Sequence, residues 1–291
     1  MLLGTANGAG AQTNTNLALD RALLRPGAGV TFAADGGETL PRGAVFFTAR
    51  CGALGRPWVL RNGLTGETVA VPVARAFTAE VAAAIGVTGR LQVGLAQPVT
   101  LYQSGDRLRG VADDRPLSTT VGGDARLHLK ASMVDAAAGG GRLTLAFAPF
   151  IAAPTGDAAQ FAGVGSVWGE LRLAGGWRRG GLLAVADLGL RLRSPTVFYG
   201  VRHDTAALTF ALGAAWTLPA RALRRRLTLI LDVDGDAQGP GRPVPVEARG
   251  GMSVRAWRGL HVAAAGGVSV SREPGAPPWR ALVEVRLAAA R

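Results

Sequence analysis

Apolar and polar residues alternate along much of this chain with a period of two. In the stretch LTFALGAAWTL, residues 208–218, large apolar side chains occupy most even positions, and Thr, Ala and Gly occupy the odd ones. A period of two is typical of a strand whose two faces meet different surroundings. In a soluble sheet the second face would carry charge, but here it is small and uncharged. The stretch therefore predicts a strand whose bulky face suits lipid.

Twelve segments of the chain have strand character. Most are roughly as long as the 9–11 residues that a tilted strand needs to cross a bilayer. The segments are residues 43–51, 68–85, 90–101, 123–133, 142–152, 166–177, 181–193, 206–218, 225–234, 243–254, 259–271 and 279–288. Several keep strict alternation, and residues 227–234 place four apolar side chains opposite Thr228, Ile230, Asp232 and Asp234. The chain is therefore expected to be all-β.

The links between these segments alternate in length. Short ones such as GVTG and WRRG are each followed by longer or more turn-rich ones such as APTGDAAQFAGVG and SPTVFYGVRHDT. Outer-membrane barrels have short periplasmic turns and longer outer loops. The predicted fold is an antiparallel up-and-down transmembrane β-barrel of about 12 strands, with both termini in the periplasm. The small faces of the strands then line the lumen.

Charged side chains fall mostly on the face opposite the bulky one. An Arg or Lys near the midplane of the lipid face costs about 2–4 kcal/mol, so these charges are expected to face the lumen. The expected lumen-facing charges are Asp124, Arg126, Lys130, Glu170, Arg172, Asp187, Arg191, Glu247, Arg249, Glu284 and Arg286. One interpretation is an ion-paired wall without further function. The other is a wet pore, in which Arg126, Arg191 and Arg286 would favour anions.

Aromatic residues lie next to the ends of the predicted strands. Rings with an apolar body and a polar edge gather at the two water–lipid boundaries of membrane barrels. The expected aromatic girdle contains Trp177, Trp216, Trp257, Trp279 and Tyr199. Trp58 and Trp168 also fall at ends served by long links, although Trp168 lies on the inner face by strict parity.

Composition adds little candidate chemistry. The net charge of +12 comes from arginines spread along the 291 residues, so nucleic-acid binding is not expected. Cys51 is the single cysteine, which leaves no disulfide framework and no cysteine-based metal site.

Histidines and loop acids give no recognisable site. His128 and His261 face inward by parity and His203 falls in a link, but no spacing to Ser132 or Asp124 distinguishes a catalytic group. The acidic residues of the longest outer link, Asp106, Asp113 and Asp114, fit a solvated loop better than a cation site. We expect no enzyme activity, no catalytic residues, no cofactor and no metal.

Three ranges divide the chain. Residues 1–12 are small and apolar and resemble the end of a truncated signal peptide; the alternative is a loose N-terminus. Residues 13–40 are expected to form a periplasmic N-terminal segment. Residues 41–291 are expected to form the outer-membrane β-barrel.

Four stretches carry a resemblance to a known family. They are LPRGAVFF (40–47), the segment 71–106 with GLAQPVTLYQSG, GDARLHLKA (123–131) and APFIAAPTGDAAQFAGVGS (148–166). Together they resemble the N-terminal β-barrel module of large OmpA-like outer-membrane proteins of Gram-negative bacteria, over about residues 40 to 176. The resemblance implies a barrel, and its motifs imply no chemistry. The peptidoglycan-binding domain that often follows in that family has no counterpart in this sequence.

The expected function follows from the barrel. We expect a passive, porin-like channel or a membrane scaffold in the bacterial outer membrane. The alternatives are a secreted, soluble all-β binding protein and a barrel that transports apolar solutes. The second would need an apolar inner wall, whereas most of the predicted wall is polar. The expected partners are outer-membrane lipid and lipopolysaccharide, the barrel-insertion machinery and a small solute, and not nucleic acid.

Overall fold

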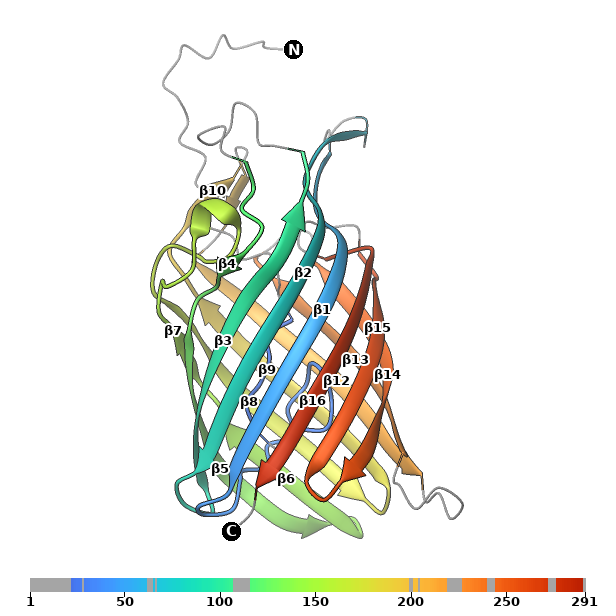
Figure 1. The fold of residues 1–291 in the computed structure, drawn as a ribbon. Coiled ribbons are helices and arrows are strands. Elements are labelled where there is room, and N and C mark those ends of the chain that lie inside the picture. Colours follow the sequence, from blue (N-terminus) through green and yellow to red (C-terminus); the bar gives the residue numbers. More distant parts are fainter. Residues whose placement is uncertain are drawn as a thin grey trace.

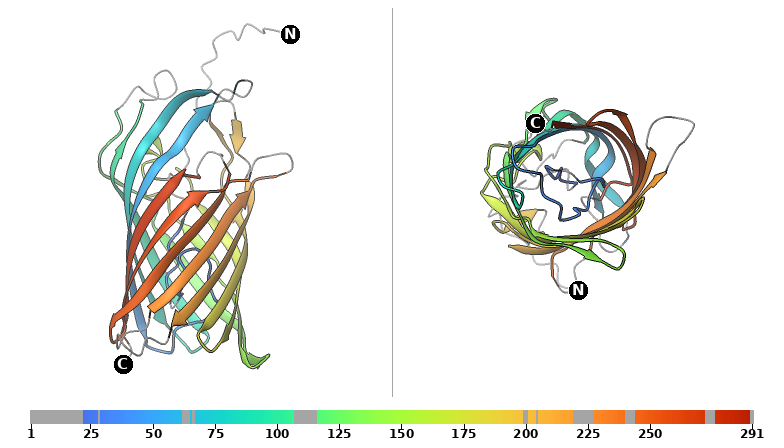
Figure 2. Two further views of the ribbon diagram at one scale, coloured as in Figure 1. Left: turned by 90° about the vertical axis from the view of Figure 1, so that its right-hand side faces the viewer. Right: turned by 90° about the horizontal axis from the view of Figure 1, so that it is seen from below.

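The chain forms a closed antiparallel β-barrel, seen along and across its axis in Figures 1 and 2. The structure is a computed structural model, and it describes residues 22–27, 29–61, 65, 67–106, 116–198, 201–203, 205–218, 227–239, 244–271 and 276–289. Within these ranges, no helix is long and apolar enough to span a membrane.

Twelve strands make the wall. They are β1 (Val45–Arg61), β2 (Thr68–Gly86), β3 (Leu91–Ser104), β5 (Arg126–Ala138), β6 (Gly141–Phe147) with β7 (Phe150–Ala152), β8 (Trp168–Arg179), β9 (Leu182–Leu192), β12 (Ala206–Leu218), β13 (Leu227–Ala237), β14 (Val246–Trp257), β15 (Leu260–Ser269) and β16 (Trp279–Ala289). Strands β6 and β7 share the neighbours β5 and β8 in one register, so together they count as one wall strand. Pairing of β16 with β1 closes the sheet. The predicted fold class and strand number are confirmed.

The links alternate as the sequence predicts. Among the described links, those after β2, β5, β8 and β14 are tight turns at one end of the barrel. The long links lie at the other end and contain β4 (Val121–Gly122), β10 (Thr196–Phe198), β11 (Val201–His203) and the short helix η1 (Ala158–Gln160) (Figure 1). The largest difference from the expected ranges is at β1. It continues to Arg61 through residues that we expected to be a link. It does so because Trp58 pairs with Val73 of β2 and packs under Phe161 of the rim.

The two faces of each strand meet different surroundings. In β12, Leu212 is 57% exposed and Trp216 is 51% exposed, whereas Thr209, Ala211 and Ala215 are buried. Large apolar side chains are exposed in the same way around the barrel, including Leu95 of β3 and Leu231 of β13. A continuous exposed apolar belt of this size suits lipid and not water.

A segment of the chain outside the wall runs through the interior. We call residues 22–27 and 29–40 the lumenal segment; Figure 2 shows it in blue crossing the inside of the barrel when seen from below. We expected residues 13–40 to lie in the periplasm, and the described part of that range lies in the lumen instead. The reason is that its backbone finds bonding partners on the polar inner wall. The expected signal remnant, residues 1–12, lies outside the described residues.

The orientation of the barrel is open to a labelling test. In a Cys51→Ala background, we expect Ala159→Cys in η1 to react with an impermeant maleimide on intact cells. Arg179→Cys, at a tight turn, is expected to react only after the cells are permeabilised, because short turns face the periplasm. Reaction of both sites on intact cells, or of the turn alone, would contradict this orientation.

Candidate functional site

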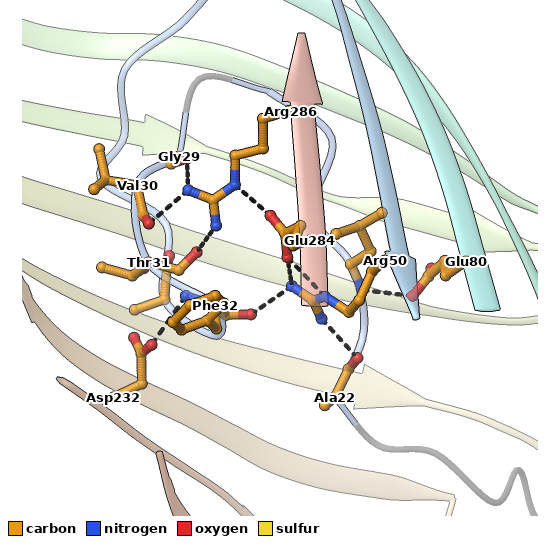
Figure 3. A network of polar contacts seen from close by, with 12 residues as sticks. Ala22, Gly29, Val30, Thr31, Phe32, Arg50, Glu80, Asp232, Glu284 and Arg286 are labelled. Atoms are coloured by element: carbon orange, nitrogen blue, oxygen red, sulfur yellow. Dashed lines mark hydrogen bonds and ion pairs between the residues drawn. The ribbon is translucent and has the colours of Figure 1, made fainter. Parts of the chain in front are cut away.

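Arg286 of β16 binds the lumenal segment through three backbone carbonyls. Its Nη1 donates to the oxygens of Gly29 and Val30 at 3.0 and 2.6 Å, and its Nη2 donates to the oxygen of Thr31 at 3.1 Å (Figure 3). The guanidinium carbon also lies 5.7 Å from the ring centroid of Phe32. Since a guanidinium presents its donors in a fixed plane, one side chain can fix three successive carbonyls.

Arg50 of β1 binds the same segment at two further points. Its Nη1 donates to the carbonyl oxygen of Ala22 at 3.2 Å, and its Nη2 donates to that of Phe32 at 2.9 Å (Figure 3). Glu284 accepts from Arg50 Nε at 2.8 Å and also pairs with Arg286. Glu284 therefore orients both arginines toward the segment.

Acidic side chains of the wall accept backbone N–H groups from the segment. Glu80 of β2 accepts from Leu24 at 3.0 Å, and Asp232 of β13 accepts from Phe32 at 2.9 Å. In the same way, Asp187 of β9 accepts from the N–H of Asp35 at 2.8 Å. Hydrogen bonds to charged groups are stronger than neutral ones, so these contacts compensate the burial of the segment's backbone.

Neutral side chains complete the backbone contacts. Gln92 of β3 donates to the oxygen of Pro26 at 2.8 Å and accepts from the N–H of Leu40 at 3.2 Å. Thr144 of β6 donates to the oxygen of Gly36. A Cβ on Gly176 of β8 would overlap that same backbone, so this wall position requires glycine.

The small inner face of β12 receives an apolar part of the segment. Phe32 and the two alanines after it are buried against Ala211 and Ala215 of β12 and against Ile230 of β13. Small wall residues leave the space that the Phe32 ring needs. The unusual small face of residues 208–218 is thus explained by what lies against it in the lumen.

Side chains of the segment add three ion pairs. Arg25 pairs with Asp187 of β9. Asp35 lies 2.5 Å from Lys130 of β5, and Glu38 lies 3.2 Å from Arg178 of β8. These three ion pairs join the segment to β5, β8 and β9.

The expected lumen-facing charges are on the inner wall. Ten are buried and Arg191 is partly buried, and the eleven are Asp124, Arg126, Lys130, Glu170, Arg172, Asp187, Arg191, Glu247, Arg249, Glu284 and Arg286. Lys130, Asp187 and Arg286 contact the lumenal segment directly. Arg126 and Glu284 act on it through Glu80 and Arg50, with which they pair.

Wall charges also pair with one another. Arg126 pairs with Glu80, and Arg191 Nη2 lies 2.9 Å from Glu170 Oε2, while its Nη1 lies 3.0 Å from Asp236 Oδ2. An arginine that is paired in this way contributes little free positive charge to the lumen. The ion pairs fit the interpretation of a salt-bridged wall better than that of a strongly anion-selective pore.

Aromatic residues separate into two groups. Trp216, Trp257 and Trp279 are exposed on the outer face and Trp177 is partly exposed, while Tyr199 lies outside the described residues. Trp58 and Trp168 are buried and belong to the inner rim, which removes them from a lipid-facing girdle. Trp168 Nε1 donates to Asp124, and the ring of Trp58 lies 6.3 Å from that of Phe161.

Little free space remains beside the start of the segment. A cavity of about 60 Å³ lies between Ala22, Leu23, Glu80 and the rim. It can hold a few water molecules, but pockets for small-molecule ligands measure roughly 300–1,000 Å³. In this state, the cavity is too small for such a solute.

The residues considered for catalysis have other contacts where the structure describes them. His128 is buried against Phe150, with ring centroids 5.1 Å apart, and His261 is half-buried. The carboxylate of Asp124 accepts from two backbone N–H groups of the rim and from Trp168. It therefore stabilises the structure of the rim. No group of three or more His, Cys, Asp or Glu among the described residues could hold a metal ion.

The remaining candidates lie in the outer links. Asp106 accepts from the N–H of Val71 at 3.0 Å and so joins its link to β2. Asp113 and Asp114 lie outside the described residues, as does the side chain of His203.

Sequence reasoning missed two parts of the site. Arg50 was not counted among the lumen-facing charges, although its parity with the buried Phe46 and Thr48 would have placed it there. The lumenal segment was missed because it is rich in Gly and Ala and has no strand period. A segment of that kind carries no local signal for its position.

Comparison with known proteins bears on the fold. The COG4313 outer membrane channel from Pseudomonas putida F1 has a TM-score of 0.61 and 15% identity, and the match covers 92% of this chain and 100% of that chain. The NanC porin has a TM-score of 0.50 and 4% identity, and the match covers 84% and 99% of the two chains. No protein-family model and no curated protein sequence matches the chain. The chain therefore has the fold of a Gram-negative outer-membrane β-barrel, and none of these matches is specific to OmpA-like proteins.

Proposed function

We propose that this outer-membrane barrel is a passive channel that its own lumenal segment closes. The observation that carries the proposal is how the segment is attached. Its hydrogen bonds to the barrel strands run through wall side chains, such as Arg50, Asp232 and Arg286, while the strands pair with one another around the whole barrel. The segment can therefore leave the lumen without breaking a hydrogen bond of the sheet.

The width of the barrel supports the same proposal. A barrel near twelve strands lies between small barrels filled by their own wall side chains and wide porins with an aqueous channel. Here the small wall residues Ala211, Gly213 and Ala215 leave the centre to the segment. Departure of the segment would open a polar lumen with a narrow apolar stripe along β12. We propose small solutes as its cargo, with no catalytic step.

Replacement of Arg286 tests the channel in a planar bilayer. Arg286→Met removes three hydrogen bonds to the segment, and bonds to charged groups are worth roughly 1.5–3 kcal/mol each. Even a loss of about 3 kcal/mol, which is less than the three bonds together, would raise the fraction of open molecules on the order of a hundredfold. We expect frequent single-channel openings where the wild-type protein is nearly silent.

Arg191→Met is the matched control, because the ion pairs of Arg191 are with Glu170 and Asp236 of the wall. We expect this variant to remain nearly silent. If correctly folded Arg286→Met protein also passes no current, the second candidate, a closed membrane scaffold with an ion-paired wall, becomes the better description.

We also propose a family relationship and a set of partners for the barrel. The motifs in residues 94–105 and 153–157 support kinship with the barrel module of OmpA-like proteins. The exposed apolar belt supports contact with outer-membrane lipid, and we propose lipopolysaccharide and the barrel-insertion machinery as partners for a barrel of this kind.

A further inference from the structure

The inner wall recognises the main chain of the lumenal segment more than its side chains. Seven carbonyl oxygens and four N–H groups of the segment bond to wall side chains. The carbonyls are those of Ala22, Pro26, Gly29, Val30, Thr31, Phe32 and Gly36, and the N–H groups are those of Leu24, Phe32, Asp35 and Leu40. Against these eleven backbone groups stand three ion pairs of segment side chains with the wall.

The wall offers partners for both polar groups of a peptide unit, the carbonyl oxygen and the N–H. Arginines, a glutamine and a threonine supply donors for carbonyl oxygens, whereas carboxylates and the same glutamine supply acceptors for N–H groups. Phe32 illustrates the pairing. Asp232 accepts a hydrogen bond from its N–H, Arg50 donates one to its carbonyl oxygen, and the guanidinium of Arg286 lies over its ring (Figure 3). A hydrocarbon offers no hydrogen-bonding groups to such a wall.

The groups that bind the backbone come from seven different strands. They are Arg50 of β1, Glu80 of β2, Gln92 of β3, Thr144 of β6, Asp187 of β9, Asp232 of β13 and Arg286 of β16. The binding groups thus surround the occupant, and a chain lying along the lumen meets them at successive positions. The site is therefore suited to an irregular, extended strand of polypeptide and not to a folded domain.

We infer that the lumen is a binding site for an extended peptide, and that the lumenal segment is its built-in occupant. A second peptide of the same chemistry, rich in Gly and Ala and carrying one aromatic residue in the place of Phe32, competes for the same wall groups. The inference rests on the proposed function in one respect, since the resident segment must be able to leave.

A labelled peptide tests the inference on the full chain. The probe is a fluorescent, end-blocked peptide of residues 22–40, added to the protein in nanodiscs and followed by anisotropy. The host is full-length Phe32→Ala, in which the resident segment loses its buried ring and the wall is unchanged. We expect saturable binding at least tenfold tighter than to the wild-type chain, whose site is already filled.

Two modified peptides separate backbone recognition from side-chain recognition. N-methylation at the amides of Leu24, Phe32 and Asp35 removes the donors to Glu80, Asp232 and Asp187, and should weaken binding at least tenfold. A peptide with Ala in place of the charged residues Arg25, Asp35 and Glu38 should bind within a few-fold of the parent. Equal binding of the N-methylated and parent peptides would overturn the inference.

The outcomes also distinguish the inference from the channel proposal. Absence of peptide binding to a Phe32→Ala chain that conducts would overturn the inference and leave the channel in place. Peptide binding to a chain that never conducts would support the inference and count against the channel. If Phe32→Ala fails to fold, as judged by heat-modifiable migration, Leu24→Pro takes its place, because proline lacks the N–H that bonds to Glu80 and so loosens the segment with the wall unchanged.

Discussion

A disulfide between the lumenal segment and β9 is expected to abolish conduction. A Cβ built on Gly36 would lie 3.2 Å from Cγ1 of Val185 and meets no other atom within 4 Å. That distance is close to the separation between a Cβ and the far sulfur of a disulfide. In a Cys51→Ala, Arg286→Met background, the pair Gly36→Cys and Val185→Cys should therefore lock the segment in place. We expect a silent bilayer when the protein is oxidised and openings after addition of reductant.

The single variant Gly36→Cys in the same background is the control. It should conduct equally in the oxidised and reduced states, because its thiol has no partner after Cys51 is removed. Gel mobility and thiol titration establish that the double variant is oxidised. Persistent current through a fully oxidised double variant would mean that ions pass without displacement of the segment, and that the segment is not the gate.

Arginine in place of Leu231 is expected to block membrane insertion. Leu231 is 67% exposed in the outer belt of β13. An arginine near the midplane of the lipid face costs about 2–4 kcal/mol, which is a large fraction of the stability of an ordinary domain. We expect Leu231→Arg to reduce the heat-modifiable, folded fraction in outer-membrane extracts by tenfold or more.

Thr228→Arg is the matched comparison on the same strand. Thr228 is partly buried, bonds to Thr217 of β12, and has the opposite parity to Leu231. An arginine there can reach water near the end of the barrel, so we expect a smaller loss of folded protein. Equal tolerance of both substitutions would show that the outer face of β13 does not meet lipid.

The strand pattern determined the wall of the barrel. In β12, the alternation of Leu212 and Trp216 with Ala211 and Ala215 states which side chains face outward, because successive residues of a strand point to opposite faces. The alternation of short and long links likewise set the up-and-down order. Both features depend on residues close together in the chain, and a single sequence contains that information.

The rim of the barrel was predictable only in part. We expected a link after residue 51, whereas β1 continues to Arg61 and buries Trp58. The Gly and Pro residues around Trp58 indicate a link locally. Packing of its ring against Val73 and Phe161 outweighs that local preference, and no sequence period reports the contact.

The content of the lumen was decided by the tertiary structure alone. Residues 22–40 have no strand or helix period, and their partners lie far along the chain: Gly29 and Arg286 are 257 residues apart, and Phe32 and Asp232 are 200 apart. The sequence placed Arg286 and Asp187 on the inner face. It was compatible with two interpretations of that face, an ion-paired wall and a wet pore. Only closure of the barrel brings charges from separate strands around one backbone, and that convergence turns a polar wall into a site that holds a peptide.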